Sequence, residues 1–352
     1  MRTTLVVTAI FVQILALAWM AGQREWIVAT GPTVWLRTTP VDPRDVFRGD
    51  YVVLNYDIST IPADKIGPAL KAELGAQNQD RERRQSYNRE IEIYVPLEVD
   101  AESDVARIGL ADLTPPASGL FIKGSVQPYQ WQNRDELVGV RYGIDAFFVE
   151  QGKGRALERT APKGTPDNIQ VPLEMRVALG QDGTAVLTEH RWSALGVGLD
   201  VHEETASNAT DSASSSRLVL SYHNASPAPL AMVLPSDLRT LRLMGVESFD
   251  GFGRGSGLQS DAVAPYSDSD VRVLQPGGTT TVELDLNDPR WAVHQSGKKP
   301  LPLWHKDLGS WRFRVMYQAP SPEACAGLAQ APLVWRGQLP SREFRNHELR
   351  RE

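Results

Sequence analysis

The 352-residue chain has little of the chemistry that metal and redox sites use. Its single cysteine, Cys325, excludes an internal disulfide and a metal site built from several thiolates. No histidine or basic residue stands beside it in the stretch SPEACAGLA, which indicates an unreactive thiol. The six histidines are all more than five residues apart, so no HExxH-type zinc motif exists. We therefore predict neither a metal nor a cofactor.

An excess of positive charge is also missing. The formal net charge is -6, which argues against a nucleic-acid partner, because such proteins usually carry a basic face. The sequence lacks the GxxxxGK[ST] phosphate loop and the GxSxG nucleophile elbow. No catalytic residue is predicted from these patterns, and a non-enzymatic role is favoured.

The N-terminus carries an apolar run from Leu5 to Ala21. Its length is at the short end of the range for a membrane-spanning helix. Ala16-Leu17-Ala18 also fits the small-residue rule for the cleavage site of a signal peptide. We favour an uncleaved anchor over residues 1–23, because the apolar run continues past that site. Both interpretations carry the chain from about Arg24 onward across the membrane.

The rest of the chain is typical of a mainly β protein. It contains 24 prolines and 28 glycines and few long runs of helix-forming residues. Residues 24–198 are expected to form a β-rich α+β domain. Its one helix is expected within PADKIGPALKAELGAQ, residues 62–77, where apolar residues recur every four positions. Residues 171–192 predict a hairpin that turns at Asp182-Gly183.

The composition changes after this hairpin. Residues 199–216 are rich in Ser, Thr and Ala and almost free of large apolar side chains, which predicts a flexible linker. Residues 217–352 contain short alternating strands joined by turns, which predicts an immunoglobulin-like β-sandwich domain.

The stretch PVDPRDVFRGDYVVLNY, residues 40–56, concentrates charged and aromatic side chains. Asp42 is a good helix N-cap, and Asp45 falls in the first turn, where a carboxylate meets free N–H groups. One helical or 3₁₀ turn is therefore expected over Pro43 to Phe47. Arg44 and Arg48 offer counter-charges to the carboxylates of this stretch.

Gly49 is expected to release the chain into a strand from Tyr51 to Tyr56. Leu54 and Tyr56 share one face of that strand, and bulky residues also occupy the other. Such a pattern predicts burial on both sides, as in a central strand.

The carboxylates of this stretch also permit chemical interpretations. A divalent cation held by Asp42, Asp45, Asp50 and Asp57 is one, although no EF-hand spacing is present. A carboxylate pair of the kind that glycoside hydrolases use is another. Arg48-Gly49-Asp50 also matches an adhesion tripeptide. A structural or partner-binding role is favoured, and the alternative is a hydrolase or metal-dependent module that uses Asp42, Asp45, Asp50 and Tyr51.

The octapeptide GDYVVLNY, residues 49–56, fits the pattern Gly-Asp-Tyr-x-x-Leu-x-Tyr. Together with VWLRTTPVDPRD (34–45) and VRYGIDAFFVEQGKG (140–154), it makes residues 25–195 resemble the GDYXXLXY family of bacterial membrane-anchored proteins. The resemblance implies a single-pass anchor in the bacterial inner membrane and domains that face the periplasm. It brings no catalytic residues.

We therefore expect a non-enzymatic binding or scaffolding module of the cell envelope. It contacts the membrane through its N-terminal helix, and anchoring there is compatible with a membrane-protein partner. The motif residues, with a structural or binding role, are Asp42, Arg44, Asp45, Arg48, Gly49, Asp50, Tyr51, Leu54 and Tyr56.

Overall fold

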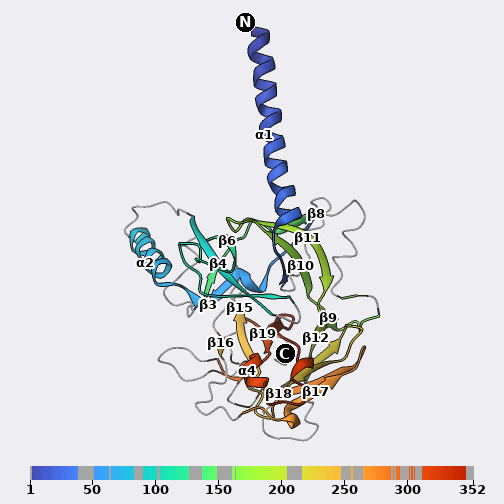
Figure 1. The fold of residues 1–352 in the computed structure, drawn as a ribbon. Coiled ribbons are helices and arrows are strands. Elements are labelled where there is room, and N and C mark those ends of the chain that lie inside the picture. The colour runs from blue at the N-terminus through green and yellow to red at the C-terminus, as the bar shows by residue number, and fades with distance from the viewer. Residues whose placement is uncertain are drawn as a thin grey trace, which may run out of the picture.

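One long helix stands on a body made of two strand-rich units (Figure 1). The structure, a computed structural model, describes a large part of the chain. The described residues are 2–38, 51–62, 65–82, 90–100, 104–126, 137–148, 161–162, 164–203, 216–246, 255–256, 265–286, 288, 291–293, 301, 303, 305 and 311–345.

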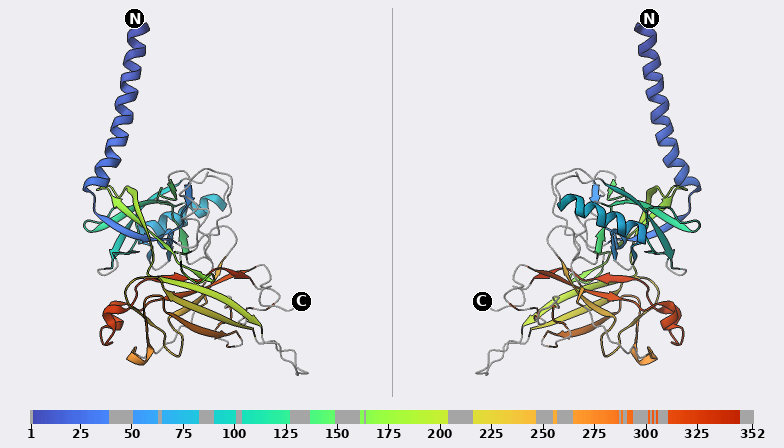
Figure 2. Two further views of the ribbon diagram at one scale, coloured as in Figure 1. Left: turned by 90° about the vertical axis from the view of Figure 1, so that its right-hand side faces the viewer. Right: turned by 90° about the vertical axis from the view of Figure 1, so that its left-hand side faces the viewer.

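Helix α1 (Arg2–Thr30) projects from the body, as Figures 1 and 2 show. Its segment Val6–Thr30 is long and apolar enough to cross a membrane and is not buried by the rest of the protein. Of the expected anchor, residues 1–23, the described residues 2–23 are thus part of a helix that continues seven residues further. It ends where Gly31 and Pro32 lead into the first strand, since proline cannot continue a helix.

The first unit follows α1, and its described residues form four small sheets and the helix α2. The sheets have the strand orders β1-β10-β11, β2-β8, β3-β7 and β5-β4-β6, and every strand pair is antiparallel. Its elements are β1 (Thr33–Arg37), β2 (Tyr51–Val53), the 3₁₀ turn η1 (Asp57–Ser59), β3 (Thr60–Pro62), α2 (Pro68–Glu82), β4 (Ile91–Val99), β5 (Ala106–Ile108), β6 (Leu120–Val126), β7 (Leu137–Gly139), β8 (Ala146–Phe148), β10 (Leu173–Leu179) and β11 (Ala185–Trp192).

The described residues of the second unit form two larger sheets and one strand pair. Their orders are β18-β13-β12-β9, β16-β15-β19-β20 with β21 also paired to β19, and β14-β17. Its elements are β9 (Ile169–Gln170), β12 (Leu195–Glu203), β13 (Ser216–Asn224), β14 (Leu230–Val233), β15 (Leu241–Val246), β16 (Gly255–Ser256), η4 (Asp268–Asp270), β17 (Val271–Leu274), β18 (Thr279–Asp285), β19 (Arg312–Gln318), α4 (Pro322–Cys325), η7 (Ala331–Leu333), β20 (Gln338–Pro340) and β21 (Phe344–Arg345).

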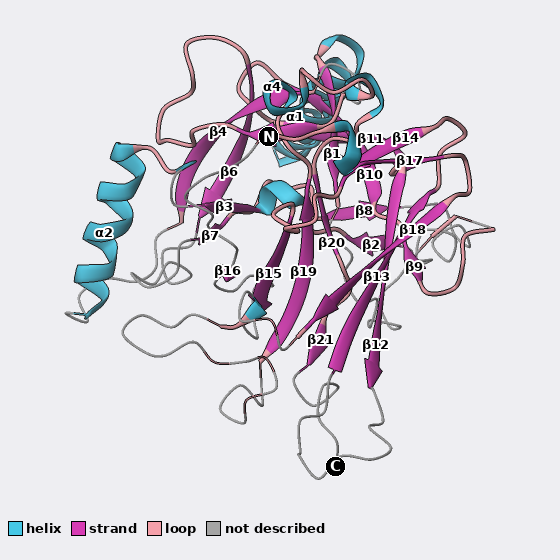
Figure 3. Cartoon of the chain, turned by 90° about the horizontal axis from the view of Figure 1, so that it is seen from below, coloured by secondary structure: helices cyan, strands magenta, loops and turns pink. Residues whose placement is uncertain are grey.

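Each unit has its own hydrophobic core. The first core takes side chains from β1, β4, β10 and α2, and the second takes them from both large sheets of the second unit. Seen from below, α2 lies at one edge of the molecule (Figure 3). The expected mainly β fold with one N-terminal apolar helix is confirmed. The immunoglobulin-like assignment of the second unit is not confirmed and stays a prediction.

The linker expected over residues 199–216 differs from the structure at both ends. Strand β12 continues to Glu203, and β13 begins at Ser216, which pairs with it. Leu199 is 2% exposed, because it packs into the second core with Leu220. Because the stretch as a whole is rich in Ser and Thr, its composition did not indicate that β12 and β13 extend into it.

The helix and the hairpin of the first unit agree with the sequence. Helix α2 lies in the expected region but starts at Pro68. The fixed φ of proline suits the first position of a helix. The Asp112 carboxylate accepts a hydrogen bond of 3.0 Å from the Leu70 N–H in the first turn of α2. The hairpin of β10 and β11 is confirmed, and Gly183 in its turn has a φ of +82°.

Candidate functional site

The described parts of the three segments that the sequence singled out, residues 34–38, 51–56 and 140–148, meet in the first unit. Strand β2 pairs with β8, so that Tyr51 stands opposite Phe148. Beyond β2, the Leu54 N–H donates to the Asp145 carbonyl oxygen at 2.7 Å. Tyr56 then forms an antiparallel bridge with Thr38, which directly follows β1. The described parts of the three segments are therefore joined to one another by backbone contacts.

Two buried tyrosines join these segments further. The Tyr56 hydroxyl donates to the Ile144 carbonyl oxygen at 2.8 Å, and the Tyr142 hydroxyl donates to the Ile58 carbonyl oxygen at 2.6 Å. Burial raises the pKa of both phenols, and the Asp145 charge adds to the effect at Tyr56. Both side chains are therefore neutral donors that hold the backbone, and neither is poised for acid–base chemistry.

The observed strand β2 is shorter than the strand from Tyr51 to Tyr56 that the sequence predicts. Strand β2 ends at Val53, because Tyr56 to Ser59 close a 3₁₀ turn in which the Tyr56 N–H donates to the Ser59 hydroxyl. Leu54 and Tyr56 are buried as expected, at 6% and 0% exposure.

The other motif residues lie outside the described part of the chain. These are Asp42, Arg44, Asp45, Arg48, Gly49 and Asp50. The helical turn expected over residues 43–47, and the cation and hydrolase hypotheses on these carboxylates, therefore stay predictions. Among the described residues, no group of three or more His, Cys, Asp or Glu side chains is placed to hold a metal ion.

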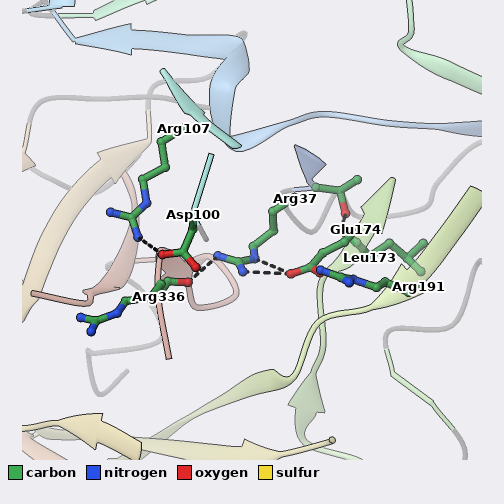
Figure 4. Close-up of polar contacts among 8 residues, drawn as sticks. Arg37, Asp100, Arg107, Leu173, Glu174, Arg191 and Arg336 are labelled. Atoms are coloured by element: carbon green, nitrogen blue, oxygen red, sulfur yellow. Dashed lines mark hydrogen bonds and ion pairs between the residues drawn. The ribbon is translucent and has the colours of Figure 1, made fainter. Parts of the chain in front are cut away.

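A row of three charged residues crosses the sheet β1-β10-β11 (Figure 4). Arg37 of β1 stands opposite Glu174 of β10, which in turn stands opposite Arg191 of β11. The Arg37 Nε and Nη2 atoms donate to one Glu174 oxygen at 3.1 and 2.9 Å. The Arg191 Nε atom donates to the other oxygen at 2.7 Å. We call these three residues the arginine–glutamate row.

The middle of the row is shielded from water. Arg37 and Glu174 are each 3% exposed, whereas Arg191 lies nearer the surface with its guanidinium 4.1 Å from the centre of the Trp35 ring. Burial by itself raises the pKa of the Glu174 carboxyl, but the charges and hydrogen bonds of Arg37 and Arg191 outweigh it, and the pKa lies below its ordinary value. Glu174 is therefore an ionised, fully paired carboxylate.

The inner end of the row contacts the second unit. The Arg37 guanidinium lies 4.3 Å from the centre of the Trp335 ring, and its Nη1 donates to the Arg336 carbonyl oxygen at 3.4 Å. Gly337 has a φ of +121°, and a Cβ added there would collide with the Arg37 guanidinium. The row thus binds the segment before β20 and couples the two units through a charged, stacked contact.

The model of the GDYXXLXY protein family matches residues 13–189, half of the chain. The chain belongs to the GDYXXLXY family. Neither the comparison with curated proteins nor the comparison with solved structures found a match.

The GDYXXLXY match begins inside α1 and ends inside β11. It includes Arg37 and Glu174 and stops two residues before Arg191, and the Trp335 contact lies outside it. The buried ion pair is thus part of the GDYXXLXY region of the chain, whereas its stacking partner comes from the second unit.

Sequence reasoning did not single out Arg37 and Glu174. Both are charged residues in mostly apolar strands, TVWLR and LEMRVAL, the second of which also contains the more exposed Arg176. Residues of this kind are rarely buried unless they are paired. A charged residue in an apolar strand is therefore a visible signal of a buried ion pair. Which two residues pair depends on the register between two strands, and Arg37 and Glu174 are 137 residues apart in the sequence.

Proposed function

We propose that this GDYXXLXY protein is a membrane-anchored, extracytoplasmic binding or scaffolding protein of the bacterial cell envelope. Helix α1 would hold it in the inner membrane as a single-pass anchor, with both units facing the periplasm. The observation that carries the proposal is α1 itself, which is apolar, long enough to span a membrane and exposed from Val6 to Trp26. Such a surface is costly in water and is covered in a bilayer.

The chemistry of the described site supports binding or scaffolding over catalysis. Both carboxylate oxygens of Glu174 accept hydrogen bonds from guanidinium groups. The Tyr56 and Tyr142 hydroxyls donate hydrogen bonds to backbone carbonyl oxygens. These groups fix the relative position of strands and units. A rigid body held near a membrane raises the local concentration of its binding surfaces for other membrane proteins.

Membrane extraction and protease access test the anchor and its direction. We expect the full chain to stay in the membrane fraction after a carbonate wash and to be released by detergent. We also expect protease added to spheroplasts to digest the body. Protein recovered in the soluble periplasmic fraction, shortened at its N-terminus, would contradict an uncleaved anchor. Protection from protease in intact spheroplasts would contradict the periplasmic orientation.

Affinity capture from membranes solubilised in mild detergent tests the partner. We expect another membrane protein to co-purify with the full chain at native expression level. The matched control replaces α1 by an unrelated single-pass helix, which separates partners of the body from partners of the anchor. Recovery of the protein alone in both forms would count against a stable partner.

A further inference from the structure

Helix α1 meets the body without a linker. The Gly31 N–H donates to the Ile27 carbonyl oxygen at 2.8 Å, and the Leu179 N–H donates to the Pro32 carbonyl oxygen at 2.9 Å. A Cβ added at Gly31 would lie 2.5 Å from the Leu179 carbonyl oxygen and 2.6 Å from the Ile27 carbonyl oxygen. The end of the helix is therefore pressed against the end of β10, and the position of the helix fixes the position of the body.

The turn between β10 and β11 lies beside the foot of α1, and Figure 1 shows these strands meeting the helix there. A Cβ built on Gly180 would lie 3.1 Å from the Ile27 Cδ1 atom, so the turn and the helix side chain are in direct contact. The Gly180 N–H donates to the Thr184 carbonyl oxygen at 2.8 Å, and the Lys123 N–H donates to the Gly183 carbonyl oxygen at 2.9 Å. The turn is held on both sides and cannot swing away from the helix.

The charged residues on α1 indicate how far the contact between Ile27 and the turn lies from the hydrocarbon core of the membrane. Arg24 and Glu25 are the first charged residues after the apolar run, so the hydrocarbon region ends near residue 23. About 20 residues rising ~1.5 Å each match a hydrocarbon core of ~30 Å. Ile27 is four residues further along the helix, which places it ~6 Å beyond the hydrocarbon edge. The headgroup layer on each side is roughly 5–7 Å thick.

We propose that the β10–β11 turn, Gly180–Thr184, is a membrane-facing surface that sits among the lipid headgroups. The inference rests on the proposed membrane anchor and adds which face of the body meets the membrane. Trp26, 70% exposed on α1 at the same level, has the amphipathic ring that accumulates at membrane interfaces. The second unit lies at the other end of the body, away from α1 (Figure 2).

The attachment to α1 holds the β10–β11 turn at the membrane, and electrostatic attraction to lipids does not. Beside the turn, the Lys123 Nζ atom is paired with Glu92 at 2.7 Å, and the Tyr94 hydroxyl donates to the same carboxylate at 2.7 Å. Asp182 adds a further negative charge, so the described residues beside the turn have no positive excess to attract anionic lipids. The contact is therefore expected to be equal in zwitterionic and anionic membranes and insensitive to salt.

A single fluorescent label on the full chain tests the surface in phosphatidylcholine vesicles. Gln181→Cys places the label on the exposed turn, and Ala324→Cys places a matched label on α4 of the second unit. Cys325 is buried, so the unsubstituted chain is expected to take up no label and serves as the blank. The quencher is a lipid with a nitroxide on its headgroup. We expect it to reduce the emission at position 181 by more than half and the emission at position 324 by less than a tenth.

Two outcomes overturn the inference in different ways. Protein that stays bound to floated vesicles with both labels unquenched would overturn the membrane-facing surface and leave the anchor intact. Protein that separates from the vesicles would contradict the anchor, and the surface with it.

A linker variant tests whether the helix imposes the contact. Twelve Gly/Ser residues inserted between Thr30 and Gly31 release the body from α1 while leaving both labels in place. We expect quenching at position 181 to fall to the level at position 324. Quenching that stays unchanged would overturn the claim that the helix holds the turn at the membrane.

Discussion

Glu174 is a buried carboxylate, and hydrogen bonds from two arginines stabilise its negative charge. Removing one partner of a buried ion pair leaves uncompensated charge and costs about 3–5 kcal/mol. We therefore expect Glu174→Gln to lower the free energy of unfolding by about that amount. Chemical denaturation of the detergent-solubilised protein, followed by tryptophan fluorescence, measures the change.

Glu189→Gln is the matched control for this substitution. Glu189 lies on β11 and pairs with Arg176 of β10 at 3.0 Å, but their side chains are 59% and 38% exposed. Exposed pairs contribute roughly 0–1 kcal/mol, so this variant should be nearly as stable as the original chain. Equal losses in the two variants would show that burial of Glu174 has no special energetic role.

The lowered pKa of Glu174 predicts a pH dependence of the same difference. A carboxyl whose pKa is lower in the folded state contributes stability that is present above its unfolded pKa of ~4.3 and is lost as the pH falls through the folded value. The stability gap between the original chain and Glu174→Gln should therefore stay constant from about pH 7 to 5 and shrink below about pH 4. A gap that keeps its full size in acid, measured by urea unfolding at each pH, would contradict the ion-pair explanation.

At the scale of elements, the motif strand is held by backbone contacts to the segment before β8. Tyr56 is fully buried, and its hydroxyl is the side-chain link to the Ile144 carbonyl oxygen. Tyr56→Phe keeps the ring and removes this bond, which should cost about 1–3 kcal/mol because a buried acceptor loses its donor. Thermal unfolding by circular dichroism measures the loss.

Tyr94→Phe provides the comparison, since the Tyr94 hydroxyl donates to Glu92 at an exposed site. That change should stay within about 0.5 kcal/mol of the original chain. If Tyr56→Phe is equally mild, the hydroxyl of the family motif is not what joins the two segments.

The elements that the sequence predicts well are those specified by neighbouring residues. The β10–β11 hairpin follows from alternation around Asp182-Gly183, and α2 follows from the spacing of Leu70 and Leu74. The length of strand β2 was overestimated, because the apolar residues Leu54, Tyr56 and Ile58 continue its alternating pattern although Asp57 to Ser59 form a 3₁₀ turn. The arginine–glutamate row could not be predicted, because alternation gives each strand its faces and leaves its partner and register open.

At the scale of the whole molecule, the chain passes between the two units more than once. Strand β9 (Ile169–Gln170) pairs with β12 in the second unit, the chain then returns to the first unit for β10 and β11, and β12 follows. A boundary at 198/199, as the composition suggested, cuts through β12. Composition marks where a chain becomes polar, but it does not report a two-residue strand that pairs with a sheet of the other unit.

This crossing predicts that the first unit does not fold well by itself. A fragment of residues 24–198 would keep β9 and lose β13, so Ile169, Leu195 and Val197, all at most 1% exposed in the whole chain, would face water. Each such side chain contributes roughly 1.5–3 kcal/mol when buried, and Arg37 would lose Trp335 as well. We expect the fragment to aggregate on size-exclusion chromatography and to lack a near-UV circular dichroism signal, whereas residues 24–352 elute as a folded species. A monomeric 24–198 fragment with an ordered near-UV spectrum would mean that the burial of these side chains by β13 and the rest of the second unit is dispensable. The two units would then be joined by the arginine–glutamate row without depending on each other to fold.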